Sequence, residues 1–283
     1  MSEITSLDVL EIINAKKRHA PAMAGALLTM LRRSYNWVID QQVYGLIVSP
    51  CDRLKSAKLI GPPPARTRRL NDTELFAFWR AAGRLGYPAG PAYQLLLLTG
   101  LRLYEAARLS WPEIEGDVIV VPAARMKGRN DQARDHLVPL SGQAQKIIAS
   151  LPRIKGGPFL FSRDAGKRPA AMTNEIKRTL DRRMLLALRA LARRDGEDHT
   201  QVTLPPWTNH DLRRVVRSGL SQLRVPFVVA EAVLAHRQRG VAVTYDLHED
   251  VQEKREALVA WAQRLGSIVN PMSDNVIALR ARR

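Results

Sequence analysis

The sequence predicts a mainly α-helical protein with one small β-sheet or hairpin, an α+β fold. Apolar residues recur at helical spacing over much of the chain, most clearly from residue 20 to about residue 43. By contrast, DVIVVP (117–122) and HLVPL (136–140) are short β-type runs separated by the polar, glycine-containing segment MKGRNDQARD. That pattern is typical of a hairpin. With 283 residues, 46% of them apolar, the chain is long enough for about two globular domains.

A proline-rich segment at residues 61–69, GPPPARTRR, predicts a linker between the two domains. Its three prolines and its arginines suit neither a strand nor the interior of a helix. We therefore expect a helical domain over residues 1–60 and a second domain over residues 70–265. Residues 266–283, which end in three arginines among the last four positions, are expected to form a basic tail.

The second domain carries signals for the ends of its helices. Asn71 or Asp72 is a suitable cap for the first helix, and residues 91–111 are interpreted as two helices broken at Gly100. Further helices are expected over residues 172–194, from near Thr208, and from about residue 249 to residue 265.

The charge of the chain indicates a polyanionic partner. Lys and Arg number 44 against 27 Asp and Glu, which gives a net charge of +17 and a pI near 10.7. Nucleic acid is the leading candidate. Cys51 is the single cysteine, which excludes an internal disulfide or a zinc site of several thiolates. No aliphatic run is long enough for a bilayer and the N-terminus lacks a signal-peptide pattern, so we expect a soluble, cytoplasmic protein.

Two cations stand in unusual sequence contexts. Arg102 directly follows an apolar run and a glycine turn, so its guanidinium must find an anion; Glu105, three residues on, is one candidate and a DNA phosphate is another. Lys127 lies at the tip of the predicted hairpin. It is either a solvated loop lysine or a proton donor delivered into a groove.

A third motif begins the helix near Thr208. Thr208 and Asp211 form a pattern like a capping box, which places His210 and Arg213 on one face of the first turns. The pair suits a phosphate better than a metal, although an exposed amphipathic helix explains it equally well. Further on, His236 follows the apolar segment AEAVLA, and Tyr245 comes nine residues later.

In their order and spacing these motifs resemble the tyrosine recombinase (phage integrase) family, and most of all its prophage integrases. The resemblance covers about residues 70–265. It is carried by TGLRLYEA, by the lysine of RMKGRNDQARDHLVPLS, and by HDLRR, LAH and VTY. The segment MLRRSYNWVIDQQVYGLIVSPCDRL is similar to the end of the family's helical core-binding domain. Residues 1–60 are too few for the whole of that domain, so they are expected to be a truncated version of it, in a fragment or in a reduced family member.

The resemblance implies a site-specific recombinase that cleaves and rejoins DNA through a 3′-phosphotyrosyl intermediate, integrating or excising a mobile element. Tyr245 is the implied nucleophile; its phenol has an ordinary pKa near 10, so it needs a base or a cationic field. Lys127 is implied as the donor of a proton to the departing 5′-oxygen.

The other implied catalytic residues act on the phosphate. Arg102 and Arg213 are expected to bind the non-bridging oxygens, where charge develops in the transition state. His210 would accept the phenol proton or hold the phosphate, and His236 would donate a hydrogen bond to a non-bridging oxygen. No metal or other cofactor is expected, because the phosphotyrosyl bond conserves the energy of the broken phosphodiester. Consistently, the sequence has neither a glycine-rich phosphate loop nor the carboxylate cluster of two-metal nucleases.

The expected partners are double-stranded DNA with attachment or core sites, further copies of the chain up to a tetramer on DNA, and DNA-bending accessory proteins. Two alternatives from other classes remain. A type IB topoisomerase would use similar chemistry to relax supercoils, and a non-catalytic DNA-binding accessory protein would explain the charge alone. A metal-dependent nuclease is the least favoured reading.

Overall fold

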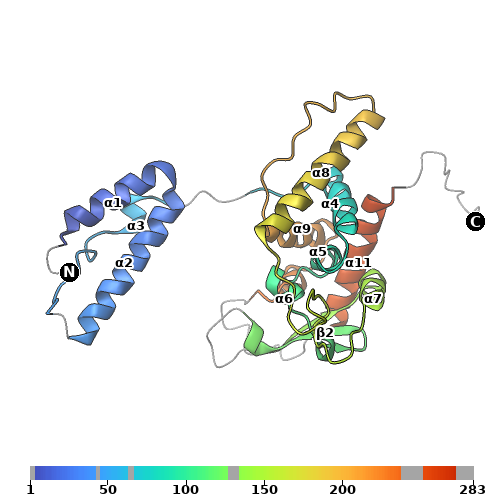
Figure 1. Ribbon diagram of the computed structural model, residues 1–283, viewed down its shortest axis with the longest axis horizontal. Coiled ribbons are helices and arrows are strands. Elements are labelled where there is room, and N and C mark those ends of the chain that lie inside the picture. The colour runs from blue at the N-terminus through green and yellow to red at the C-terminus, as the bar shows by residue number, and fades with distance from the viewer. Residues whose placement is uncertain (1–3, 43–44, 63–66, 127–133, 237–250, 272–283) are drawn as a thin grey trace, which may run out of the picture. The chain divides into compact units, whose positions relative to one another are not determined.

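The computed structural model describes residues 4–42, 45–62, 67–126, 134–236 and 251–271 (Figure 1). The chain divides into two compact units, residues 1–67 and 68–283. Both are built mainly of helices, and the second contains one small antiparallel sheet. The predicted fold class is therefore confirmed. None of the helices within these ranges combines the length and the apolarity that crossing a membrane requires.

The first unit packs two long helices and a short one, α1 (Ser6–His19), α2 (Pro21–Gln41) and α3 (Ser56–Leu59). The long helix expected from residue 20 is α2, and it begins at a proline, whose missing N–H costs nothing in the first turn. Helix α1 was not predicted. A capping box marks its start, since Asp8 accepts a 2.7 Å hydrogen bond from the backbone N–H of Thr5.

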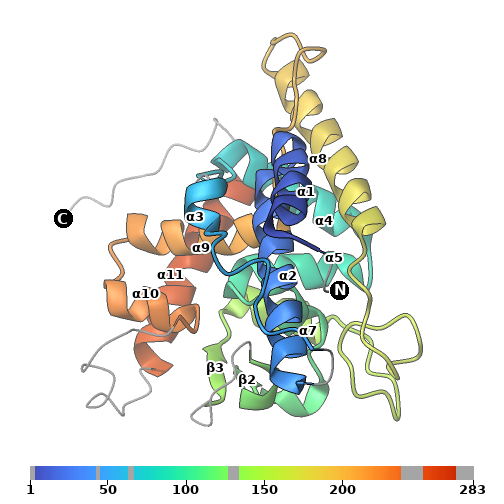
Figure 2. The ribbon, with the colours of Figure 1, turned by 90° about the vertical axis from the view of Figure 1, so that its left-hand side faces the viewer.

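The second unit contains eight α-helices within the described residues, and several begin or end where the sequence predicts. Asn71 caps the first of them through a capping box with Glu74. Figures 1 and 2 show the long basic helix α8 lying along α4. The eight are α4 (Asp72–Leu85), α5 (Ala89–Thr99), α6 (Leu103–Ala107), α7 (Gly142–Ala149), α8 (Asn174–Arg194), α9 (Asn209–Gln222), α10 (Phe227–Val233) and α11 (Val251–Val269).

The sheet has three short strands in the order β1 (Ile114–Glu115), β2 (Val118–Val121) and β3 (His136–Pro139). Strands β2 and β3 are the two predicted runs and pair antiparallel, with Val121 opposite His136. Lys127, predicted at the tip between them, lies outside the described residues.

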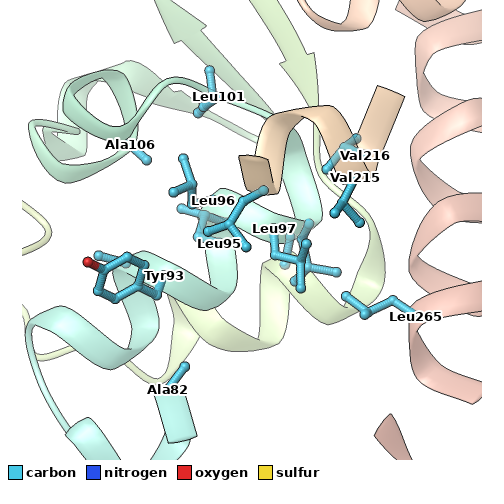
Figure 3. Close-up of a cluster of buried hydrophobic side chains, with 14 of the residues drawn as sticks. Ala82, Tyr93, Leu95, Leu96, Leu97, Leu101, Ala106, Val215, Val216 and Leu265 are labelled. Atoms are coloured by element: carbon cyan, nitrogen blue, oxygen red, sulfur yellow. The ribbon is translucent and has the colours of Figure 1, made fainter. Parts of the chain in front are cut away.

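Helix α5 forms the centre of the core. Its side chains Leu95, Leu96, Leu97 and Leu98 are all at most 2% exposed, which is why the sequence there is continuously apolar rather than amphipathic. Figure 3 shows leucines of α5 gathered with Val215 and Val216 of α9 and with Leu265 of α11. The core therefore fixes α9, which carries two predicted site residues, against the end of α5.

The predicted end of the last helix is wrong. Helix α11 continues to Val269, whereas Leu265 was expected to be its last residue and Gly266 to begin the tail. Leu265 and Val269 are both buried at a spacing of four residues, so the apolar face continues past the glycine. Burial of that face outweighs the low helix propensity of Gly266.

Candidate functional site

A glycine turn after α5 presents Arg102. Gly100 ends the helix in the left-handed region, with φ of +68°. A Cβ atom there would lie 2.8 Å from Cδ2 of Leu234, so the position excludes a side chain for steric as well as conformational reasons. The turn makes Arg102 the N-cap of α6 and confirms the predicted break at Gly100.

Arg102 is paired with the buried Glu105 but remains partly exposed. Its Nη1 donates to Oε1 of Glu105 at 2.6 Å, and its backbone N–H donates to Oε2 at 2.8 Å. The predicted contact three residues along the chain is therefore present. The side chain of Arg102 is 29% exposed, and within the described part of the chain its Nε and Nη2 have no hydrogen-bond partner. Those two groups can bind an anion without breaking the pair with Glu105.

Arg213 is buried, only 3% exposed, and joins three parts of the second unit. Its Nη1 donates to the carbonyl oxygen of Gly100 at 2.6 Å, and its Nη2 donates to that of Leu234. Burial, and next to it the positive charge of Arg102, lowers the pKa of Arg213 to about 10, so the guanidinium still carries its charge at neutral pH. Helix α9 is thereby tied to the turn before Arg102 and to the end of α10.

His210 lies in the first turn of α9 and is exposed. The side of the ring that faces the protein is still partly desolvated. This desolvation, and then the positive charges of Arg214, Arg213 and Arg102, lower the pKa of His210, so the imidazole is neutral at neutral pH and able to accept a proton. The predicted capping box is present, since Asp211 accepts a hydrogen bond from the backbone N–H of Thr208 at 2.7 Å. His210 and Arg213 are three residues apart in α9, as predicted, but they differ in burial, because His210 reaches solvent and Arg213 does not.

His236 follows the end of α10. Its Nδ1 lies 2.8 Å from Oε2 of Glu231, and the side chain is 41% exposed. The other carboxylate oxygen of Glu231 accepts a 2.5 Å hydrogen bond from Nε of Arg217 in α9. Neither Glu231 nor Arg217 was singled out from the sequence, because their contact joins two helices and no local spacing predicts it.

His136 is a third residue that sequence reasoning missed. It lies on β3, only 5% exposed, and the charges of Lys254, Glu105 and Arg213 all act on it. Burial, with Lys254 the next cause, lowers its pKa to about 4. It is therefore neutral at physiological pH. The run HLVPL was interpreted only as a strand, and a histidine inside an apolar strand was the available signal.

Lys127 and Tyr245 lie outside the described residues, so their placement relative to the arginines stays a prediction. Arg125 donates from Nη2 to the backbone carbonyl of Glu105 at 2.8 Å. Arg125, two residues before Lys127 in the sequence, is therefore tied to α6 at the residue that pairs with Arg102.

The charges of Arg102 and Arg213 both lower the pKa of His210, so the structure brings these three side chains close enough to interact electrostatically. Arg213 also donates to the carbonyl of Leu234 at the end of α10, two residues before His236. The arrangement concentrates positive charge and one neutral imidazole, which suits an anion such as a phosphodiester. Across the described ranges, no three His, Cys, Asp or Glu side chains cluster in a way that could hold a metal ion.

Known proteins are similar to this chain in sequence. The chain matches the Phage integrase family over residues 68–252, more than half of its length. It is 26% identical over 273 residues to prophage integrase IntZ of Escherichia coli (strain K12), covering 94% of this chain and 61% of IntZ. It is 31% identical over 187 residues to prophage integrase IntA of the same strain, covering 62% and 39% respectively. The chain therefore spans less than two thirds of the length of these relatives.

Solved structures share the fold. One is a lambda integrase(75-356) dimer bound to a COC′ core site, with a TM-score of 0.59, 16% identity, and coverage of 83% of this chain and 80% of that chain. Another is the Tn1549 transposon integrase with circular intermediate DNA, with a TM-score of 0.54, 16% identity, and coverage of 90% and 84%. The family match over residues 68–252 covers more than half of the chain, and the chain therefore belongs to the phage integrase family.

Proposed function

We propose that the protein is a site-specific DNA recombinase, an integrase that cleaves and rejoins DNA through a 3′-phosphotyrosyl intermediate. The observation that carries the proposal is the junction made by Arg213. Its two hydrogen bonds connect the turn before Arg102, the first turns of α9 and the end of α10 before His236. Three motifs that are separate in the sequence are thus joined by one buried side chain.

Cleavage begins with attack on a DNA phosphorus by the phenolic oxygen of Tyr245. His210, neutral at physiological pH, accepts the phenol proton. Arg102 binds a non-bridging oxygen through its Nε and Nη2, and Arg213 adds its buried charge. His236 donates to a non-bridging oxygen.

The bond from phosphorus to the 5′-oxygen then breaks. Lys127 donates a proton to the departing oxygen, which becomes a 5′-hydroxyl. The phosphotyrosyl bond conserves the energy of the broken phosphodiester, so attack by a 5′-hydroxyl of another strand reverses the steps and completes strand exchange.

The partner that we propose is double-stranded DNA, bound by several copies of the chain. A net charge of +17 favours many phosphate contacts, and α8 contributes the exposed Arg178 and Arg182. One structure of similar fold, at 15% identity, a TM-score of 0.59 and coverage of 84% of this chain and 66% of that one, is a lambda integrase tetramer bound to a Holliday junction. It supports a tetramer as the working assembly. DNA-bending accessory proteins are a further proposed partner.

The test separates recombination from the other readings. A preferred site is first selected from a pool of randomised duplexes, and two labelled duplexes of different length carrying that site are then incubated with the protein. A recombinase exchanges strands and yields products of two new lengths, while duplexes with a scrambled site remain unchanged. A supercoiled plasmid is incubated with the protein in parallel. Relaxation of this plasmid without strand exchange between the duplexes would indicate a topoisomerase, and binding without cleavage would indicate an accessory protein.

The selected duplex should also bind much more weakly as salt is raised from low to physiological concentration.

A further inference from the structure

Glu231 connects His236 to helix α9. One carboxylate oxygen lies 2.8 Å from Nδ1 of His236, and the other accepts a 2.5 Å hydrogen bond from Nε of Arg217. The three side chains form a continuous chain from α9, across α10, to a residue proposed to touch the DNA phosphate. We refer to them as the Arg217–Glu231–His236 chain.

The backbone independently fixes this contact. The N–H of His236 donates to the carbonyl of Glu231 at 2.9 Å, and the N–H of Ala235 donates to that of Ala232 at 3.0 Å. Ala235 is left-handed, with φ of +47°. These are the two bonds and the left-handed residue of a Schellman motif. The turn at the end of α10 therefore returns His236 toward the carboxylate five residues earlier.

The contact also determines which ring nitrogen carries the proton. Partial burial raises the pKa of Glu231, but hydrogen bonds from Arg217 and His236 outweigh burial and leave the pKa below its ordinary value. Glu231 is therefore an ionised carboxylate at neutral pH and can only accept hydrogen bonds. Nδ1 of His236 must therefore carry a hydrogen, and Nε2 is the ring nitrogen that faces the substrate. Nε2 can donate to a phosphate oxygen once the ring is protonated on both nitrogens.

Arg217 balances the negative charge of Glu231. A bare carboxylate beside a phosphate site would repel the substrate, whereas a carboxylate paired at 2.5 Å adds little net charge. Arg217 is itself held in place, since its Nη1 donates to Oγ of Ser221 at 2.5 Å and its guanidinium lies 5.1 Å from the centre of the Phe227 ring. Glu231 can thus orient an imidazole without weakening the attraction for DNA.

We propose that Glu231 is a positioning residue that keeps a hydrogen on Nδ1 of His236 and directs Nε2 to the scissile phosphate, with Arg217 neutralising the carboxylate. When the phosphate binds, the ring takes a second proton from solvent on Nε2 and donates that hydrogen to the non-bridging oxygen. The inference rests on the proposed function for the role of His236. The proton position that it requires is a property of the protein without DNA.

The first test reads that proton position by ¹⁵N NMR of the imidazole rings in the full-length protein at mildly alkaline pH. The six histidines are labelled, and the His236 signal is assigned as the one lost in His236→Asn. The parent should show Nδ1–H, and Glu231→Gln should retain it, because the amide oxygen can still accept the hydrogen bond. Glu231→Ala should shift the ring toward Nε2–H. An unchanged ring form in Glu231→Ala would overturn the proposal.

The second test is a kinetic cycle of the initial cleavage rate on the selected duplex. Glu231→Ala should lower the rate about 10- to 100-fold, the range found for carboxylates that orient metal-binding histidines, with unchanged DNA affinity. Glu231→Gln should recover part of the loss. In a His236→Ala background, Glu231→Ala should cause no further loss, because its effect passes through the imidazole. Additive losses would instead mean that Glu231 acts elsewhere and would refute the inference.

Asp72→Ala is the matched control. Asp72 forms a 2.5 Å ion pair with Arg264, also between two helices of the second unit. Among the described residues, it forms no hydrogen bond or ion pair with a proposed catalytic residue. Its loss should leave both the His236 signal and the cleavage rate unchanged. If the parent cleaves no DNA, the proposed function fails, and the NMR experiment alone still decides the position of the proton.

Discussion

Nη1 of Arg213 donates a 2.6 Å hydrogen bond to the carbonyl oxygen of Gly100, 113 residues earlier in the chain. Gly100 ends α5 and lies two residues before Arg102, so this bond fixes one proposed catalytic arginine relative to the other. The second bond of Arg213, to Leu234, extends the same link to the end of α10. Arg213 is therefore a structural residue as well as a proposed catalytic one.

Arg213→Ala should lower the free energy of unfolding by about 2–4 kcal/mol, because two buried carbonyl groups lose a charged donor. Denaturant unfolding monitored by circular dichroism measures the change. Arg178→Ala removes an exposed arginine of α8 and serves as the control, with an expected change within about 0.5 kcal/mol. Equal effects of the two substitutions would show that the buried bonds contribute no stability.

Gly219→Ala should disrupt the packing of α9 on α11. A Cβ atom at residue 219 would lie 2.2 Å from Cζ3 of Trp261, whose ring is buried and whose Nε1 is held by the carbonyl of Leu97 at 2.8 Å. We expect a loss of about 1–3 kcal/mol from overpacking, seen as a lower Tm, together with slower DNA cleavage. Gly142→Ala, in α7 with open space around it, should leave the Tm unchanged or raise it. Equal changes in Tm for Gly219→Ala and Gly142→Ala would contradict the close approach of α9 to Trp261.

His136 should make the protein less stable in mild acid. The unfolded chain takes up a proton on this histidine near pH 6.5, whereas burial keeps the folded side chain neutral down to about pH 4. The unfolded state therefore binds more protons between these values, and stability falls as the pH falls through that window, by about 3 kcal/mol at most. Unfolding curves at pH 7.5 and 4.5 measure it.

His136→Gln provides the comparison for this pH effect, since glutamine does not titrate. Groups other than His136 titrate equally in both proteins, so the difference in pH dependence isolates the histidine. The variant should lose less stability than the parent on acidification. The same loss in both would assign the acid sensitivity to other groups.

Lys127→Ala should cleave ordinary DNA about 10²- to 10⁴-fold more slowly, the range typical of lost acid catalysis. Sulfur in place of the 5′-bridging oxygen should restore most of the rate, because a thiol has an ordinary pKa near 8.5 and leaves without a proton. Arg102→Ala should remain slow on the sulfur substrate, because it acts on non-bridging oxygens. Equal rescue of both variants, or no rescue of Lys127→Ala, would assign the proton donor elsewhere.

Local signals in the sequence were sufficient for those parts of the fold that depend on local chemistry. Gly100 has the left-handed conformation that ends a helix, and Thr208 with Asp211 forms a capping box, so both boundaries could be predicted. The contact of Arg102 with Glu105 follows from their spacing. The end of α11 could not be predicted from Gly266, because burial of Val269 four residues after Leu265 decides it.

The contacts that shape the site depend on tertiary structure. Nothing near Arg213 in the sequence indicates that it binds the carbonyls of Gly100 and Leu234 rather than facing solvent with His210. The pairing of Glu231 with Arg217 likewise requires α9 and α10 to pack together. A residue type at a given spacing predicts a chemical group, whereas its partners depend on which helices meet.

The most direct test of the proposed chemistry is covalent attachment to DNA. The selected duplex, nicked beside the scissile phosphate so that the released strand diffuses away, traps the phosphotyrosyl intermediate for a denaturing gel. The parent should form an adduct whose modified peptide, identified by mass spectrometry, contains Tyr245, and Tyr245→Phe should bind the duplex equally well without forming it. An adduct formed by Tyr245→Phe, or a modified peptide from another part of the chain, would contradict the assignment of the nucleophile.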